Sequence, residues 1–88
     1  MDGDDYEVAS KILASKHRTN LTIELLDGAK TPTELADRFD EHQPTVSRAL
    51  SELRDMGIVD STSQQRGRLY WIRDEKRDIA EYIRDRRE

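Results

Sequence analysis

The chain lacks several features that define large classes of proteins, and each absence excludes something. It has no cysteine, so disulfides, thiolate metal sites and cysteine nucleophiles are excluded. Its apolar runs are only a few residues long, too short to span a membrane. Its start lacks the apolar segment of a signal peptide. Since 88 residues suffice for one small domain, the sequence predicts a single cytoplasmic domain over residues 1–88.

A positive charge balance, which is the usual sign of nucleic-acid binding, is also missing. There are 19 acidic and 15 basic residues, giving a net charge of −4. Residues 1–7 contain four acids and no base, so residues 8–88 are neutral overall. Between Ser61 and Arg73 there are three arginines and no acid. We therefore expect an acidic, flexible tail over residues 1–5 and a small basic segment late in the chain.

Lysine and large apolar residues are scarce as well. Arg outnumbers Lys by 11 to 4, and hydrophobic residues make up only 34% of the chain. An acidic composition with little lysine resembles that of proteins from extreme halophiles, in which an acidic surface keeps the protein hydrated in molar salt. The composition therefore suggests a halophilic, archaeal source.

What the chain does have is helical periodicity, because apolar residues recur at three- and four-residue spacing in four segments. The predicted helices cover residues 4–14, 16–27, 31–39 and 43–56. The period then changes to two, which predicts strands over residues 58–63 and 68–73. Asp74 is predicted to cap a final helix over residues 74–88. The fold class is therefore mainly α with a small β-hairpin.

Local signals mark two helix ends sharply. Thr31 and Glu34 form a capping box with Pro32 at the first helical position. Gly57 suits the left-handed position after the fourth helix, where Ile58 could close the usual contact with Leu53. These signals predict where the third helix begins and where the fourth ends.

The order of these elements and four local motifs resemble the winged helix-turn-helix regulators of the ArsR and MarR families. The motifs are TELADRF (33–39), QPTVSRAL (43–50), LRDMGIV (53–59) and GRLYWI (67–72). Together they extend the resemblance over about residues 15–72. It implies three helices, a two-stranded wing and a C-terminal helix, with the helix-turn-helix over 31–56 and the wing over 58–73.

The turn of the helix-turn-helix departs from the family pattern, which usually has glycine, an aliphatic residue and serine. Here the three residues are Asp40, Glu41 and His42. Asp40 can adopt the left-handed conformation, whereas His42 is a weaker cap than serine. This leaves the first residue of the recognition helix open, although Gln43 is the expected start.

The resemblance implies that the helix from Gln43 enters the major groove of double-stranded DNA and that the wing contacts the backbone or minor groove. Arg48 is suited to guanine and Gln43 to adenine. Gln43 to Ser51 contains no acid, which favours this role over that of an ordinary solvated face. Arg54 could instead pair with neighbouring acids. The predicted DNA-binding residues are Thr33, Gln43, Pro44, Thr45, Ser47, Arg48, Ser51, Arg54, Arg66 and Arg68.

The outer helices contain more apolar residues than a small core needs, and terminal helices build the two-fold dimer in the family that the chain resembles. Trp71 is predicted to face away from Tyr70 and Ile72. A homodimer is the favoured interpretation, and closure of the domain's own core is the alternative. The predicted dimer contacts are Val8, Ile12, Trp71, Ile79, Tyr82 and Ile83.

No cofactor, metal or small-molecule ligand is predicted. His17 and His42 are the only histidines, and no catalytic constellation is present, so we do not expect an enzyme. The favoured function is sequence-specific binding of double-stranded DNA in transcription regulation. A winged-helix protein-interaction module and a DNA-binding protein of replication or plasmid control remain as alternatives.

Overall fold

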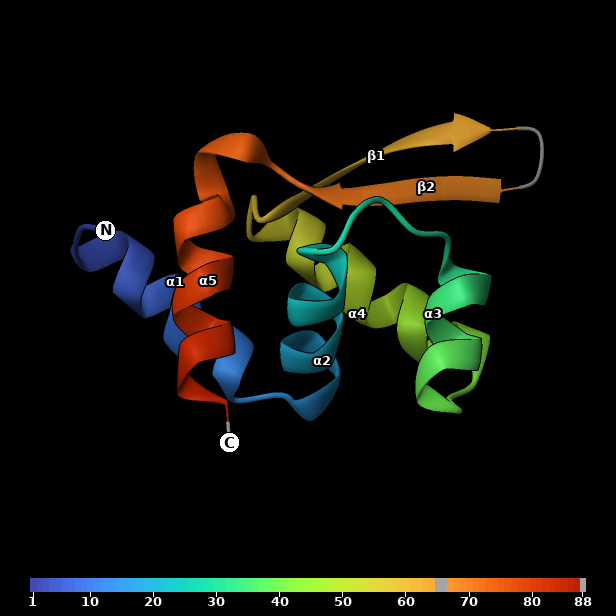
Figure 1. The fold of residues 1–88 in the computed structure, drawn as a ribbon, viewed down its shortest axis with the longest axis horizontal. Coiled ribbons are helices and arrows are strands. Elements are labelled where there is room, and N and C mark those ends of the chain that lie inside the picture. Colours follow the sequence, from blue (N-terminus) through green and yellow to red (C-terminus); the bar gives the residue numbers. More distant parts are fainter. Residues whose placement is uncertain (65–66, 88) are drawn as a thin grey trace.

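The helices and strands follow one another in the order that the sequence predicts (Figure 1). The computed structural model describes residues 1–64 and 67–87. Within these residues the elements are α1 Gly3–Leu13, α2 Lys16–Leu25, α3 Pro32–Phe39, α4 Gln43–Asp55, β1 Val59–Gln64, β2 Gly67–Ile72, η1 Asp74–Lys76 and α5 Arg77–Arg86. The predicted fold class, mainly α with a β-hairpin in a winged helix-turn-helix, is confirmed.

The core forms around α2, which packs against α1, α4 and α5. Each helix contributes the apolar stripe that its periodicity predicts, and complete burial of one Leu or Ile side chain stabilises the fold by about 1.5–3 kcal/mol. The largest fully buried side chains are Ile12, Leu25, Leu35, Leu50, Leu53, Ile58, Ile79, Ile83, Val59 and Thr22. This core supports α3 and α4 at one end of the molecule and α1 and α5 at the other (Figure 1).

The start of α3 and the turn that follows it are built as the local sequence predicts. The Thr31 hydroxyl accepts a hydrogen bond from the Glu34 amide at 3.2 Å, and the Thr31 amide donates to the Glu34 carboxylate at 3.0 Å. Asp40 is left-handed, with φ 52° and ψ 49°. The Glu41 amide then donates to the carbonyl oxygen of Ala36 at 3.0 Å. α4 begins at Gln43, and His42 makes no side-chain capping bond.

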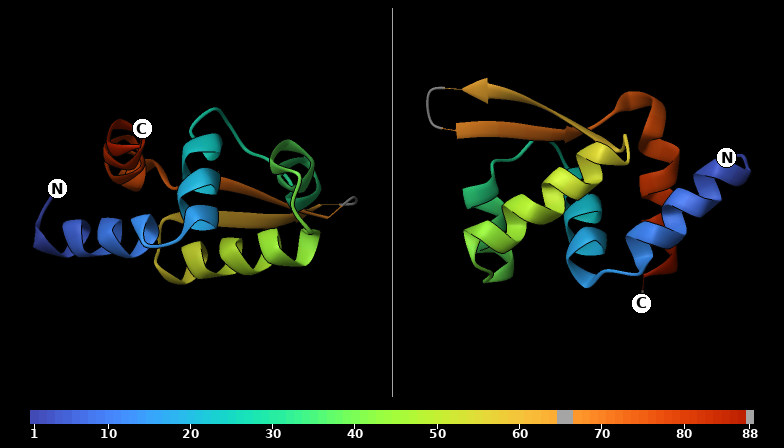
Figure 2. Two further views of the ribbon diagram at one scale, coloured as in Figure 1. Left: turned by 90° about the horizontal axis from the view of Figure 1, so that it is seen from below. Right: turned by 180° about the vertical axis from the view of Figure 1, so that it is seen from behind.

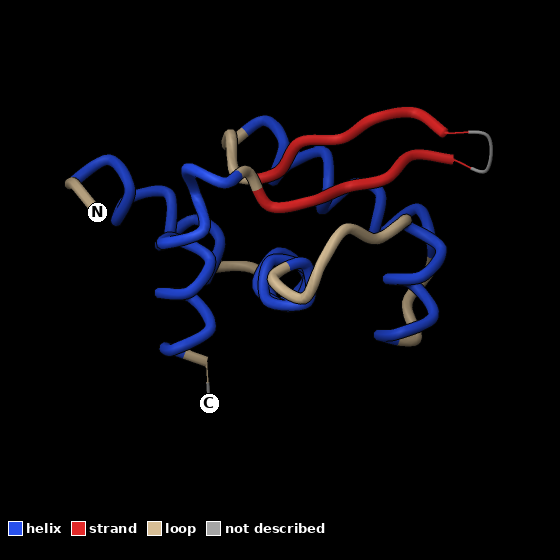
Figure 3. Tube along the Cα trace, turned by 45° about the horizontal axis from the view of Figure 1, so that its top comes forward, coloured by secondary structure: helices blue, strands red, loops and turns tan. Residues whose placement is uncertain are grey.

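The end of α4 leads directly into the hairpin. Gly57 has φ 78°, and the Ile58 amide donates to the Leu53 carbonyl at 3.1 Å, which completes the predicted Schellman ending. β1 and β2 then pair antiparallel. The hairpin runs along the helices, and β2 packs against α2 and α3 while β1 packs against α4 (Figure 3). Tyr70 is buried in β2, whereas Trp71 is partly exposed on the opposite side, as expected.

The N-terminal prediction is wrong, because residues 1–5 are not a flexible tail. α1 already begins at Gly3, and Asp2 and Asp5 form a reciprocal capping box. Asp5 also lies 3.8 Å from the ammonium group of Lys76. The acids of this segment stabilise the positive end of a helix. They belong to the folded structure of α1 and do not form a solvated tail.

The predicted start of the last helix is also corrected. Asp74 does not cap it, because Asp74–Lys76 forms a single 3₁₀ turn and α5 begins at Arg77. Lys76 occupies the cap position and makes no side-chain capping bond. Arg73 lies directly after β2, and its guanidinium is 2.9 Å from the Glu75 carboxylate. The chain therefore turns through a short, charged connection before α5.

Candidate nucleic-acid interface

The helix α4, which the sequence predicts to be the recognition helix, lies at an outer surface of the molecule beside the hairpin (Figure 2). Val46, Ala49, Leu50 and Leu53 face the core and are buried. α3 packs against the same helix, where the small side chain of Ala36 is buried. Because this side of α4 packs on the core and on α3, the opposite side of the helix faces outward.

The outward side of α4 carries polar side chains with no partner in the part of the chain that the structure describes. The predicted contacts that are exposed are Gln43, Pro44, Arg48, Ser51 and Arg54, and those that are partly buried are Thr45 and Ser47. None of these side chains forms a hydrogen bond or ion pair with a described residue. The alternative in which Arg54 pairs with a neighbouring acid is therefore not realised. These donors are free to meet a ligand.

Carboxylates do occur around α4, but two of them, Glu41 and Glu52, lie close to bases of α2. Glu41 lies 3.4 Å from Nδ1 of His17. Glu52 lies 3.3 Å from Nη1 of Arg18. Both carboxylates therefore have a contact with α2, and the face of α4 from Gln43 to Ser51 contains no acid.

Thr33 is exposed in the first turn of α3, beside the capping box. Hydrogen bonds from the backbone and the side chain of Thr31 lower the pKa of Glu34, and the charge of Lys30 adds to this effect. The capping carboxylate is therefore anionic at neutral pH. The Thr33 hydroxyl is the group in this turn that remains available to a phosphate.

Of the two predicted contacts in the wing, Arg68 lies within the described residues. Arg68 lies at the start of β2 and donates from Nη1 to the Ser61 hydroxyl across the hairpin at 3.3 Å. It is partly buried, so a contact with DNA would involve the remaining face of its guanidinium. Arg66, the other predicted wing residue, lies outside the described residues.

At the opposite end of the molecule, three of the six predicted dimer contacts are corrected. Ile12, Ile79 and Ile83 have no exposed surface, because α1, α2 and α5 pack against one another and enclose them. Val8, Trp71 and Tyr82 are partly exposed. The exposed apolar side chains that the sequence interpretation missed here are Met1, Tyr6 and Leu13.

Tyr6 illustrates how this surface is organised. Its ring lies against that of Tyr82 in an edge-to-face arrangement with centroids 5.4 Å apart, yet 49% of the residue is exposed. Tyr6 has the helical spacing to Ala9 and Leu13, so the apolar period was visible in the sequence. What the period could not show is which side of the stripe the neighbouring helix covers.

Among the described residues, no helix combines the length and the apolar character that a membrane crossing demands. Within the same ranges of the chain, no group of three or more His, Asp or Glu side chains comes together in a way that could hold a metal ion.

Comparison with known proteins places the sequence among regulators. The profile described as "Bacterial regulatory protein, arsR family" matches residues 15–61. A biofilm growth-associated repressor of Agrobacterium fabrum is 35% identical over 66 residues, which cover 75% of this chain and 56% of the repressor. The chain therefore spans little more than half the length of that relative.

Solved structures show the same fold. The transcriptional repressor BigR from Xylella fastidiosa superposes with a TM-score of 0.80 and 25% identity, over 91% of this chain and 80% of the repressor. HlyU from Vibrio cholerae gives a TM-score of 0.80 at 24% identity, over 97% of this chain and 96% of HlyU. The second likeness concerns the fold alone. Both superpositions extend beyond the residues that the family profile matches.

Proposed function

The chain belongs to the ArsR family of bacterial regulatory proteins, and from this premise we propose that it regulates transcription by binding double-stranded DNA at specific sequences. In the proposal, α4 enters the major groove, whose width admits an α-helix. Thr33 and Arg54 contact phosphates, and Arg68 lies near the backbone or minor groove. No enzymatic activity, cofactor or small-molecule ligand forms part of it.

The observation that carries the proposal is the outward face of α4. From Gln43 to Ser51 this face has no acid, and its polar side chains have no partner among the described residues. Arg48 presents a forked donor suited to the two acceptors of guanine, and Gln43 presents a donor and an acceptor suited to adenine. A merely solvated helix face in so acidic a chain would be expected to include carboxylates.

Homodimerisation is part of the proposal and rests on the apolar surface of α1 and α5. Tyr6 and Leu13 are exposed there, with Val8 and Tyr82 partly exposed beside them. A two-fold dimer built on this surface would direct two copies of α4 to half-sites about 34 Å apart, one turn of DNA. The proposed operator is accordingly palindromic.

The test is selection of bound duplexes from a random pool by the wild-type chain, followed by affinity measurements on the recovered duplex. We expect Arg48→Ala to weaken binding by about five- to 150-fold, because one bidentate base contact contributes about 1–3 kcal/mol. The matched control is Arg73→Ala, which removes the same charge at the end of the hairpin away from its tip.

The outcomes separate the proposal from its alternatives. Recovery of a palindromic duplex, with a large loss for Arg48→Ala and a loss below about twofold for Arg73→Ala, supports it. Equal losses for both variants would show that only bulk charge matters. Recovery of no enriched duplex would contradict DNA binding and leave the protein-interaction module as the function to test.

A further inference from the structure

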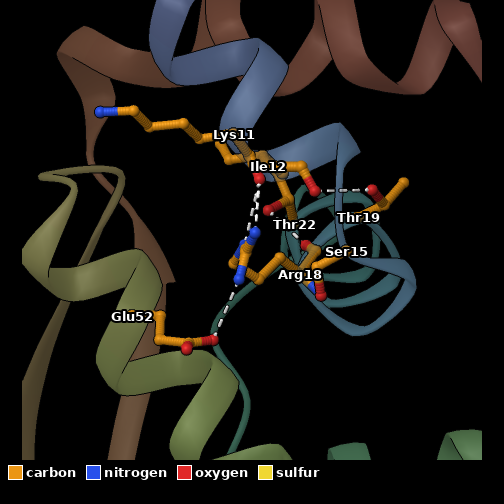
Figure 4. Close-up of polar contacts among 7 residues, drawn as sticks. All are labelled: Lys11, Ile12, Ser15, Arg18, Thr19, Thr22 and Glu52. Carbon is orange, nitrogen blue, oxygen red and sulfur yellow. Dashed lines mark hydrogen bonds and ion pairs between the residues drawn. The ribbon is translucent and has the colours of Figure 1, made fainter.

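Arg18, near the start of α2, connects two helices that share little packing surface. Its guanidinium donates from Nε and Nη2 to the carbonyl oxygen of Lys11, at 3.2 and 2.6 Å (Figure 4). Nη1 donates to Oε1 of Glu52 at 3.3 Å. Lys11 lies in the last turn of α1 and Glu52 lies in α4. Among the described residues, Arg18 is the side chain that hydrogen-bonds to both helices.

The contact with Arg18 gives the Lys11 carbonyl a hydrogen-bond donor at the end of α1. In a continuing helix the Ser15 amide would donate to the Lys11 carbonyl, but here it donates to Ile12 instead, at 3.1 Å. The Arg18 guanidinium takes its place, and its positive charge lies at the negative end of α1. The end of α1 is therefore fixed to α2 by a charge-assisted, forked contact.

Arg18 is itself held firmly. Its amide donates to the Ser15 hydroxyl at 3.2 Å, and its carbonyl accepts from the hydroxyl of Thr22 at 2.8 Å (Figure 4). Thr22 is fully buried, and only 19% of the Arg18 side chain is exposed. The planar guanidinium reaches its two partners from separate nitrogens in a fixed geometry, which the compact ammonium group of lysine does not reproduce.

The second contact of the Arg18 guanidinium, from Nη1 to Glu52, lies next to the proposed DNA-binding face of α4. Glu52 follows Arg48 by four residues, a spacing at which side chains on a helix can meet. In the structure Glu52 turns to Arg18, and Arg48 has no ion-pair partner among the described residues. Without Arg18, the carboxylate would be free to pair with Arg48 or to repel a phosphate.

We propose that Arg18 is a positioning residue for DNA recognition. By joining the end of α1 to α4, it fixes the separation and tilt of the two recognition helices in a dimer that forms through α1 and α5. This inference rests on the proposed function. Neighbouring base pairs are about 3.4 Å apart along the duplex, so a loosely held α4 would tolerate half-sites at altered spacing.

The first experiment compares two duplexes for each protein variant. One is the palindrome that the wild-type chain selects, and the other carries one additional base pair between its half-sites. For Arg18→Lys we expect the preference for the selected spacing to fall about two- to thirtyfold, the range that corresponds to the usual coupling through side-chain networks. Glu52→Gln, which leaves the Lys11 contact in place, should change the preference in the same direction by less.

The matched control is Arg77→Lys. Arg77 also donates to a carbonyl near the end of a helix, that of Leu26, at 3.3 Å, but it connects α5 with the end of α2 and has no bond to α4. We expect this variant to keep the spacing preference of the wild type. A loss of stability without a positioning role would lower the affinity for both duplexes and leave their ratio unchanged.

The second experiment measures the connection without DNA. Because the chain has no cysteine, spin labels can be placed specifically at Ser10→Cys in α1 and Asp55→Cys in α4, both exposed positions. The labelled chain is diluted with unlabelled chain, so that distances are measured within one protomer. Pulsed electron paramagnetic resonance should give a narrow distance distribution, and Arg18→Lys should broaden it.

The outcomes distinguish this inference from the function on which it rests. A broadened distance distribution together with a reduced spacing preference supports the positioning role. An unchanged distribution, or an unchanged spacing preference in a variant that still binds the duplex, overturns it while DNA binding stands. If the wild-type chain selects no duplex, the proposed function fails, and the assignment of Arg18 to DNA recognition falls with it.

Discussion

The α3–α4 end of the molecule and the α1–α5 end present opposite kinds of surface. At the first, Gln43, Arg48 and Ser51 are polar, exposed and without partners among the described residues. At the second, the exposed side chains include Tyr6 and Leu13, and Asp5 is paired with Lys76. The difference agrees with the proposed function, in which DNA binds at the first end and a second copy of the chain at the other.

This contrast also shows how an acidic chain can present a surface to an anion. At the α1–α5 end, Asp2 and Asp5 form the capping box that begins α1. Near α4, Glu41 and Glu52 are each paired with a base from α2. Net charge therefore describes this protein poorly, because the placement of the carboxylates decides which surface can approach a phosphate.

The largest expected effect concerns the apolar side chains at the α1–α5 end that belong to the core and not to the exposed surface. Ile83→Ala should lower the free energy of unfolding by about 2–5 kcal/mol, because Ile83 is completely buried and its loss leaves a cavity. Urea denaturation measures the change. The control at the other end is Ser51→Ala, for which we expect a change within about 0.5 kcal/mol. Similar losses of unfolding free energy for both variants would contradict the assignment of Ile83 to the core and of Ser51 to the outward face of α4.

The next prediction concerns specificity at the α3–α4 end. Gln43→Ala should reduce discrimination by about 1–3 kcal/mol at one adenine position of the selected duplex. The affinity for duplexes already mismatched at that position should change little, because they gain nothing from the amide. Competition binding with a set of single-base variants measures this. A uniform loss over all duplexes would place Gln43 on the backbone instead of on a base.

The features that the sequence predicted correctly are those that neighbouring residues determine among themselves. Thr31 and Glu34 form their capping box with no help from the rest of the chain. The same holds for the left-handed turn at Asp40 and for the helix ending at Gly57. The capping box of Asp2 and Asp5 was equally local, and it was overlooked because its acids suggested a solvated tail.

The features that the sequence did not reveal depend on residues far apart in the chain. Ile12 and Ile83 were assigned to a partner because periodicity identifies an apolar stripe but not the helix that covers it. Arg18 and Glu52 are 34 positions apart, and nothing local distinguishes either from an ordinary surface residue. The polar face of α4 was predicted well, since an outward face is defined by the buried residues of the same helix.

A smaller effect is expected when the apolar surface at the α1–α5 end is changed without touching the core. Leu13→Ser should weaken homodimerisation by about 1 kcal/mol, the value of a partly exposed Leu side chain withdrawn from water. Sedimentation equilibrium measures the dissociation constant, and Ser10→Ala on the same helix serves as control. A monomeric wild type, or a dissociation constant that Leu13→Ser leaves unchanged, would contradict an interface on this surface.

The smallest effects concern the capping box, which supports the α3–α4 end without facing a ligand. Thr31→Ala should lower the free energy of unfolding by about 1 kcal/mol, as the loss of a helix cap usually does. It should also raise the pKa of Glu34 part of the way to its ordinary value near 4.5, because the side-chain hydrogen bond is lost while the backbone bond remains. Nuclear magnetic resonance titration of the Glu34 carboxyl measures the second change.

The direction of the pH dependence follows from the sign of that shift. Because folding lowers the pKa of Glu34, the carboxylate contributes stability above the pKa of the unfolded chain, and this contribution is lost as the pH falls through the lower, folded value. The wild type and Thr31→Ala should therefore differ in stability most at neutral pH and less below the folded pKa. A difference that stays constant from neutral to strongly acidic pH would show that the Thr31 hydroxyl caps α3 independently of the charge on Glu34.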